Sequence, residues 1–84
     1  MPFVYIVRCS DGSYYTGWAV DVTRRVAQHN AGRGARYTRT HGPVELVYRE
    51  EVADRKTAMR REAAIKRWPR ERKERLIGEN ESQA

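Results

Sequence analysis

The sequence predicts a small α+β domain in which a three-stranded antiparallel or mixed sheet carries flanking helices in the order β-β-α-β-α-α. Residues 3–9 (FVYIVRC) and 13–19 (SYYTGWA) are rich in β-branched and aromatic side chains, as strands are. The Ser-Asp-Gly between them is a tight-turn sequence, so the two runs should form a hairpin. With 84 residues, 39% hydrophobic and 33% charged, the chain fits one domain with a small core.

Capping and breaking residues delimit the segments that follow the hairpin. Asp21 can cap a helix over residues 22–31, which a glycine then ends. Residues 33–43 (RGARYTRTHGP) have no periodicity, and we expect a basic loop there. Pro43 closes this loop, and the sequence VELVYREEV predicts a third strand over residues 44–52.

Two further helices complete the predicted domain. Asp54 can cap a helix over residues 55–68, and Pro69 begins another over 69–78 because proline is favoured in a first helical turn. We expect a single domain over residues 1–78 and a flexible tail over 79–84. The sequence has neither a long apolar run nor a signal peptide, so we expect a cytoplasmic protein without a membrane partner.

The net charge of the chain narrows the choice of partner. Its 17 Lys and Arg residues against 11 Asp and Glu residues give a net charge of +6, and 14 of the 17 are arginine. An arginine side chain can hold a phosphate with two hydrogen bonds, and basic small domains are suited to polyanions. Charge alone fits both a nucleic-acid partner and a solvated surface.

The length of the hairpin loop decides which tyrosines share a face of the sheet. A two-residue Asp-Gly turn would put Tyr5 and Tyr15 on opposite faces. A three-residue Ser-Asp-Gly loop, with Gly12 left-handed, would instead pair Tyr5 with Gly17. Tyr5 and Tyr15 would then share a face, and Tyr14 would pack on the other. The loop sequence by itself permits both registers.

Three polar residues of the predicted helices are candidates for a site. Arg25 and His29 lie one helical turn apart, at the rim of the packed face of their helix. For either residue alone, an exposed position without a functional role is the favoured interpretation. Glu62 falls among the apolar positions of its own helix, namely Ala58, Met59, Ala63 and Ile65. A carboxylate there needs a partner. Either an ion pair with Lys66 or a functional role would explain it.

Together, these positions resemble the GIY-YIG nuclease family. Tyr5 in VYI and Tyr15 in YTG match the two motif tyrosines. The segment DVTRRVAQHN is similar to the family's helix with an arginine and, one turn later, a histidine, here Arg25 and His29. RREAAIK resembles the metal-binding segment, with its glutamate at Glu62. The resemblance covers residues 3 to about 76 and is strongest to the short, stand-alone bacterial branch.

The resemblance implies roles for these five residues in hydrolysing a phosphodiester bond. Tyr5 would orient or deprotonate the attacking water, and Tyr15 would fix its position. Arg25 would favour the tyrosine's phenolate form and hold a phosphate oxygen, while His29 would position the water or relay a proton. Glu62 would be the one protein ligand of a single Mg²⁺ or Mn²⁺ ion. These roles need both tyrosines on one face, so we predict the three-residue hairpin loop.

The resemblance and the basic loop together predict the partners. We expect Arg33, Arg36 and Arg39 to contact nucleic acid, with Tyr37 as a stacking surface. The predicted activity is metal-dependent endonucleolytic cleavage of nucleic acid, with DNA as the expected substrate and a role on branched structures in repair or recombination. The alternative is a non-catalytic nucleic-acid-binding module. In either case a protein partner could provide targeting, because no separate targeting domain is expected.

Overall fold

A three-stranded antiparallel sheet forms the centre of the molecule. The computed structural model describes residues 1–82, with side chains described as far as Glu79. The strands are β1 (Phe3–Cys9), β2 (Tyr14–Ala19) and β3 (Val44–Glu51), and their order in the sheet is β2-β1-β3. β1 is therefore central, and both of its neighbours are edge strands. A bulge in the β1–β3 pairing adds one residue to β3 between the partners of Ile6 and Val7.

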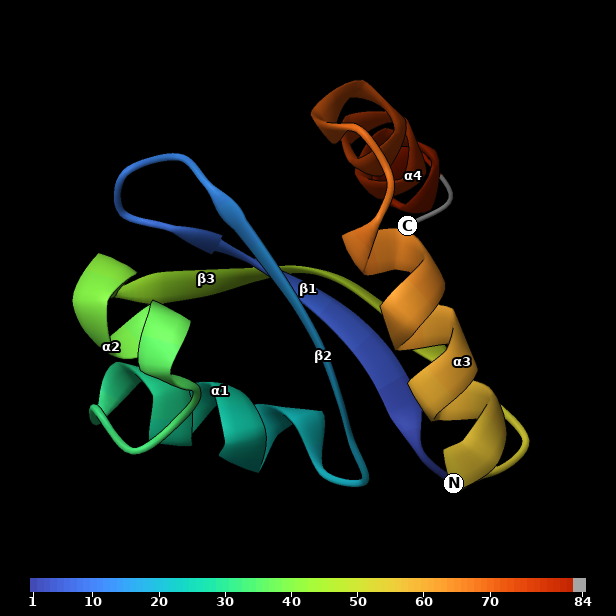
Figure 1. Ribbon diagram of the computed structural model, residues 1–84, viewed down its shortest axis with the longest axis horizontal. Helices are drawn as coiled ribbons and strands as arrows, with labels where there is room; N and C mark the ends of the chain where they lie inside the picture. The colour runs from blue at the N-terminus through green and yellow to red at the C-terminus, as the bar shows by residue number, and fades with distance from the viewer. Residues whose placement is uncertain (83–84) are drawn as a thin grey trace.

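Helices cover both faces of this sheet (Figure 1). Helices α1 (Val22–Asn30) and α2 (Arg36–His41) lie on one face. Helices α3 (Arg55–Lys66) and α4 (Arg70–Ser82) lie on the other. The predicted α+β fold, an antiparallel sheet with flanking helices, is confirmed. None of the described helices has the length and apolar character that crossing a membrane requires.

The hairpin has the three-residue loop. The Cys9 N–H donates to the Ser13 carbonyl over 2.7 Å, and the Gly12 N–H donates back to the Cys9 carbonyl over 2.9 Å. Gly12 has a φ of 87°, the left-handed conformation that this loop requires and that glycine adopts without strain. Tyr5 consequently lies opposite Gly17. The predicted register is confirmed, and the two-residue turn is wrong.

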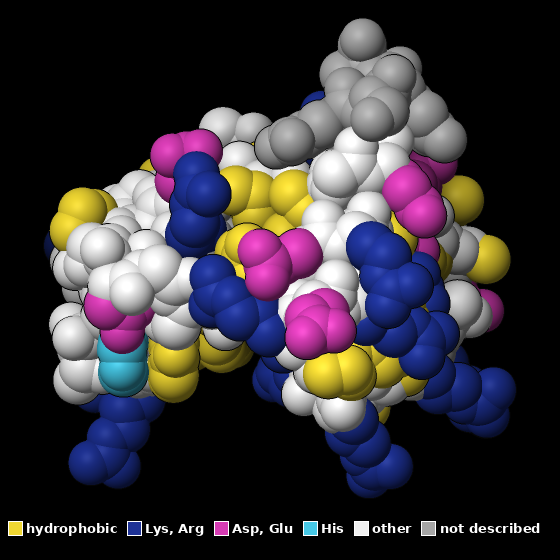
Figure 2. Space-filling view, turned by 90° about the horizontal axis from the view of Figure 1, so that it is seen from above, with side chains coloured by type: hydrophobic (Ala, Val, Ile, Leu, Met, Phe, Trp, Pro, Cys, Tyr) yellow, Lys and Arg dark blue, Asp and Glu magenta, His cyan; other side chains and the backbone are white. Residues whose placement is uncertain are grey.

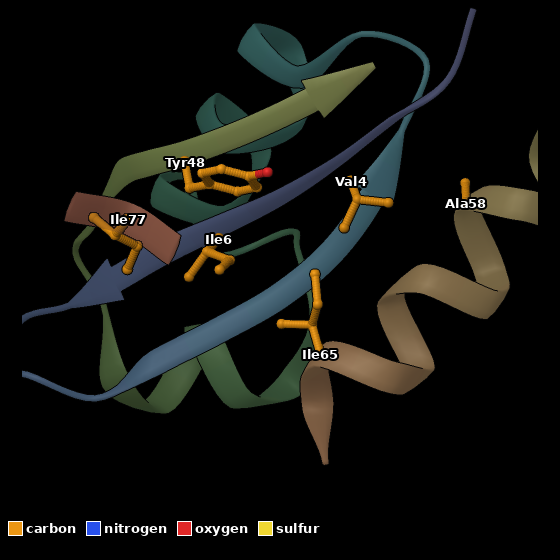
Figure 3. Close-up of a cluster of buried hydrophobic side chains, with 6 residues drawn as sticks. All are labelled: Val4, Ile6, Tyr48, Ala58, Ile65 and Ile77. Atoms are coloured by element: carbon orange, nitrogen blue, oxygen red, sulfur yellow. The ribbon is translucent and has the colours of Figure 1, made fainter. Parts of the chain in front are cut away.

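This register divides the core into two clusters, one on each face of the sheet. The cluster under α3 and α4 consists of Val4, Ile6, Tyr48, Ala58, Ile65 and Ile77 (Figure 3). The cluster on the α1 face consists of Tyr5, Val7, Cys9, Val22 and Val44. Tyr14 packs against the first cluster and Tyr15 against the second, as predicted. The α1 face is thus the one that carries both motif tyrosines.

Helix α3 is rotated relative to the prediction. Met59 is 56% exposed and Ala63 is exposed, so placing them in the core was wrong. Arg61 is half-buried instead. Its guanidinium lies over the Trp68 ring, 5.1 Å from the centroid, and its Nε is 3.0 Å from Glu50 Oε1. The rotation leaves Glu62 half-buried at the border of the buried side of α3.

Most predicted boundaries differ from the observed ones by only a few residues. The largest difference is α2, a short helix within the segment predicted to be a loop. Helix α3 ends at Lys66 rather than residue 68, because Pro69 disfavours helical geometry in the residue before it. Helix α4 continues to Ser82, which makes four residues of the predicted 79–84 tail helical. Residues 83–84 of that tail lie outside the described residues.

The Thr16 hydroxyl provides a stability test of this core. Among the side chains that the structure describes, Thr16 Oγ1 is the one buried polar atom without a hydrogen-bond partner, and the residue is 2% exposed. Valine has the same shape without the unpaired hydroxyl. We therefore expect Thr16→Val to raise the free energy of unfolding by about 1 kcal/mol, measured by urea denaturation. The exposed Thr23→Val on α1 is the matched control and should change it by less than about 0.5 kcal/mol. A less stable Thr16→Val protein would contradict the assignment.

Candidate active site

A buried hydrogen bond between Tyr5 and His29 forms the centre of the candidate site. The Tyr5 hydroxyl lies 2.7 Å from His29 Nε2, and the two residues are 1% and 2% exposed. Tyr5 reaches across β2 at Gly17, where a β-carbon would lie 2.5 Å from the tyrosine hydroxyl. His29 was expected at the rim of the packed face of its helix, whereas the structure buries it against Thr38 and Ala35. Because Gly17 has no side chain, the Tyr5 ring has room to cross β2.

The two polar side chains expected beside Tyr5 on the α1 face, Tyr15 and Arg25, lie close to this hydrogen bond. The Tyr15 ring meets the His29 ring edge to face, with centroids 5.4 Å apart. Arg25 is half-buried, and its Nη1 donates to Gln28 Oε1 over 3.2 Å. Its guanidinium is near enough to Tyr5 and His29 to influence the pKa of both.

Glu62 approaches the same place from the opposite face of the sheet. Its Oε1 is 3.3 Å from Lys66 Nζ, and the Glu62 side chain is 22% exposed. The ammonium of Lys66 also lies over the Tyr15 ring, 5.4 Å from its centroid. Glu62 is close enough to raise the pKa of Tyr5. The ion pair expected from the sequence is thus present, and it lies within the candidate site.

Burial sets the protonation states at the centre of the site. Burial raises the pKa of Tyr5 to about 12, and although the Arg25 guanidinium lowers it, this effect is smaller. Arg25 acts in the expected direction, because it lowers the pKa of Tyr5, but desolvation of the phenolate outweighs this attraction. Burial, and then Arg25, lowers the pKa of His29. Both side chains are neutral near pH 7.

Two residues that the sequence did not single out hold His29 in place. Thr38 Oγ1 lies 2.7 Å from His29 Nδ1, and Thr38 is 1% exposed. The neighbouring Asn30 fixes the end of α1 to β3, because its side chain accepts from the Val44 N–H over 2.7 Å and donates to the Val44 carbonyl over 3.1 Å. A threonine in a basic segment and an asparagine at a helix end give no sequence signal for such contacts.

The predicted nucleic-acid contacts lie on and before α2. Arg33, Arg36 and Arg39 are exposed. Tyr37 is 38% exposed, but rings face both sides of it: His41 at 4.0 Å and Tyr15 at 6.0 Å between centroids. Tyr37 therefore has less free ring surface for stacking on a base than expected.

The chain is similar to known proteins in sequence and in fold. The model of the GIY-YIG catalytic domain matches residues 1–75. A UPF0213 protein of Staphylococcus aureus is 54% identical over 77 residues, which cover 92% of this chain and 94% of that protein. The solution NMR structure of a UPF0213 protein from Bacillus halodurans is 44% identical, with a TM-score of 0.58 over 93% of this chain and 84% of that one. A second NMR structure, of a protein from E. faecalis, has a TM-score of 0.61 at 36% identity, covering 94% of this chain and 84% of that one.

The lowered pKa of His29 predicts how stability depends on pH. An unfolded histidine takes up a proton near pH 6.5, whereas buried His29 takes one up only at lower pH. Between these two values the unfolded state binds more protons, so the free energy of unfolding should fall as pH decreases below about 6.5. Urea denaturation at a series of pH values measures this effect.

His29→Gln should lose part of the pH dependence, and His41→Gln, at the half-buried second histidine, is the comparison variant. The prediction would be wrong if the free energy of unfolding depended on pH in the same way, between pH 7.5 and 5, for wild-type and His29→Gln protein.

Proposed function

Because this chain belongs to the GIY-YIG nuclease family, we propose that it is an endonuclease that hydrolyses phosphodiester bonds, with DNA as its substrate. One observation carries the proposal. The buried hydroxyl of Tyr5, 2.7 Å from His29 Nε2, lies within the influence of Arg25, Tyr15 and Glu62. The five residues whose types suit phosphodiester hydrolysis therefore converge on one point.

The neutral Tyr5–His29 pair supports a proton relay. A tyrosine with a pKa near 12 is protonated at neutral pH, so it can take a proton from water only if it releases its own. Neutral His29, hydrogen-bonded through Nε2, is positioned to accept that proton. The water oxygen then bonds to phosphorus, the bond to the leaving oxygen breaks, and that oxygen takes a proton from surrounding water. His29 ends the step as imidazolium.

Arg25 and Tyr15 supply electrostatics and position. The half-buried guanidinium of Arg25 is placed to stabilise the charge that develops on a nonbridging phosphate oxygen. The Tyr15 ring contacts the His29 ring, and the Lys66 ammonium lies over it. It can therefore orient the water beside Tyr5.

Glu62 is the residue that would hold a divalent ion. Among the described residues, no three His, Cys, Asp or Glu side chains gather as a metal site. A single, partly exposed carboxylate nevertheless suits Mg²⁺ or Mn²⁺, because Mg²⁺ keeps several waters and often takes only one or two protein carboxylates. When bound, the ion would neutralise charge on the phosphate. Lys66 provides the counter-charge for Glu62 in the ion-free protein.

Arg33, Arg36 and Arg39 provide the basic contact for the nucleic-acid backbone. Figure 2 shows that basic side chains elsewhere are interspersed with acidic ones on the face seen from above, so net charge does not by itself define a binding surface. The arginines on and before α2 are distinguished by belonging to the segment that contacts His29 through Thr38. A role in repair or recombination, a cytoplasmic location and a targeting partner stay predictions.

The non-catalytic binding module is the alternative. It would keep the exposed arginines but would have no need for a buried tyrosine–histidine hydrogen bond beside a carboxylate. A salt-sensitive complex without cleavage under any metal would favour it.

Substitutions at two site residues test the activity. We expect Glu62→Gln and Arg25→Gln each to lower the cleavage rate by about 10² to 10³, since each removes a preorganised electrostatic partner. The assay incubates purified protein with duplex, flap, junction and single-stranded DNA, and with RNA, in Mg²⁺, Mn²⁺ or chelator. Arg24→Gln, at the exposed neighbouring position on α1, is the control and should keep its rate. Cleavage that survives both Glu62→Ala and Arg25→Ala would refute the proposed site.

Substrate binding tests the basic segment separately. In the Glu62→Gln background, Arg36→Ala and Arg39→Ala should each weaken DNA binding at all sequences and reduce the slope of log affinity against log salt by about 1. Fluorescence anisotropy at several salt concentrations gives both quantities. Arg75→Ala, on α4 at the opposite face of the sheet, should leave the slope unchanged. An unchanged slope in the α2 variants would place the DNA elsewhere.

A further inference from the structure

Two groups of the segment before and within α2 contact His29 Nδ1, the nitrogen that does not face Tyr5. Thr38 Oγ1 is 2.7 Å from it, and the Ala35 N–H is 3.3 Å from it. The Thr38 hydroxyl also donates to the Ala35 carbonyl over 2.8 Å. Gly34 lets the segment close in, since a β-carbon there would overlap the His29 ring. His29 thus has a close partner on each ring nitrogen.

These distances distinguish between the two neutral forms of His29. If Nδ1 carries the proton, it donates to Thr38, Thr38 donates to Ala35, and Tyr5 donates to Nε2, so all three short contacts are hydrogen bonds. If Nε2 carries it, Nδ1 and Thr38 Oγ1 face each other at 2.7 Å as two acceptors unless the threonine gives up its bond to Ala35. In exchange, the second form keeps the bond from the Ala35 N–H over 3.3 Å, which the first form gives up because Nδ1 then carries a proton of its own.

We infer that Thr38 is a positioning residue that keeps the proton of neutral His29 on Nδ1, so that Nε2 is free to accept the proton of Tyr5. The role of this acceptor rests on the proposed nuclease function, but the position of the proton does not. Thr38 touches neither substrate nor reacting atoms and acts through the histidine.

The Ala35 N–H makes the effect of removing the threonine hydroxyl specific. In Thr38→Val the ring loses the acceptor of its Nδ1 proton, while the Ala35 N–H remains as a donor towards Nδ1. The proton should then move to Nε2, which would donate to Tyr5 instead of accepting from it. Serine keeps the hydroxyl, so Thr38→Ser should retain the original form.

Nitrogen NMR of the imidazole rings tests the inference without DNA or metal. The chain has only two histidines, so a His41→Gln variant assigns the signals. Long-range ¹H–¹⁵N spectra at pH 7.5 should show His29 protonated at Nδ1 in wild-type protein and Thr38→Ser, and at Nε2 in Thr38→Val. Thr40→Val, at an exposed threonine of the same helix, should match wild type. Amide spectra report whether each variant is folded.

Cleavage kinetics provide the second measurement. We expect kcat of Thr38→Val to fall about 10- to 100-fold with little change in KM, and Thr38→Ser to stay within about 3-fold of wild type. An Nε2 proton in wild-type His29, or an Nδ1 proton retained in folded Thr38→Val, would overturn the inference. A changed proton position with unchanged kcat would overturn its catalytic part. If wild-type protein cleaves nothing, the proposed function fails, while the NMR result still decides the proton position.

Discussion

The left-handed conformation of Gly12 is the constraint on which the site depends. It sets a three-residue loop, and side chains alternate along a strand, so it decides which face of the sheet receives Tyr5 and Tyr15. A register shifted by one residue would place Tyr5 and Tyr15 on opposite faces of the sheet. The same register places Gly17 opposite Tyr5, where the missing side chain leaves room for the ring. Two glycines thus act together, one through its backbone and the other through its small size.

The segment predicted to be a loop is a structural part of the site. Its helix α2 is attached at its C-terminal end to the hairpin loop, where the Ser10 hydroxyl and N–H both donate to the His41 carbonyl, over 3.0 and 3.1 Å. Its buried side contacts His29 through Thr38, while its exposed side carries Arg36 and Arg39. One short helix therefore joins the proposed DNA contact to the proposed proton acceptor.

The sequence predicted the parts of this molecule that follow from local patterns. The strands, the capped helices and the five converging side chains could be named because turn residues, caps and motif spacing are local signals. The burial of His29 could not, because it depends on α2, whose six residues fold where Ser10 and His29 hold them rather than by their own propensity. The rotation of α3 was missed for a similar reason: the Arg61 contacts with Glu50 and Trp68 outweigh the burial of Met59. The raised pKa of Tyr5 could not be predicted, because it depends on burial, which outweighs Arg25 and cannot be read from the sequence.

The edge position of β2 explains how side chains from helices on opposite faces of the sheet can meet. His29 comes from α1 on one face and Glu62 from α3 on the other. A central strand would be flanked by neighbours that keep such groups apart, but β2 has a neighbour on one side only, and α3 packs along it. The Glu62–Lys66 ion pair can therefore lie beside this edge strand, and Lys66 contacts the Tyr15 ring. The same edge is open to solvent, as the side-chain exposures of 22% for Glu62 and 45% for Lys66 indicate. An ion pair this exposed contributes little to stability, so giving it up to bind the proposed divalent ion would cost little.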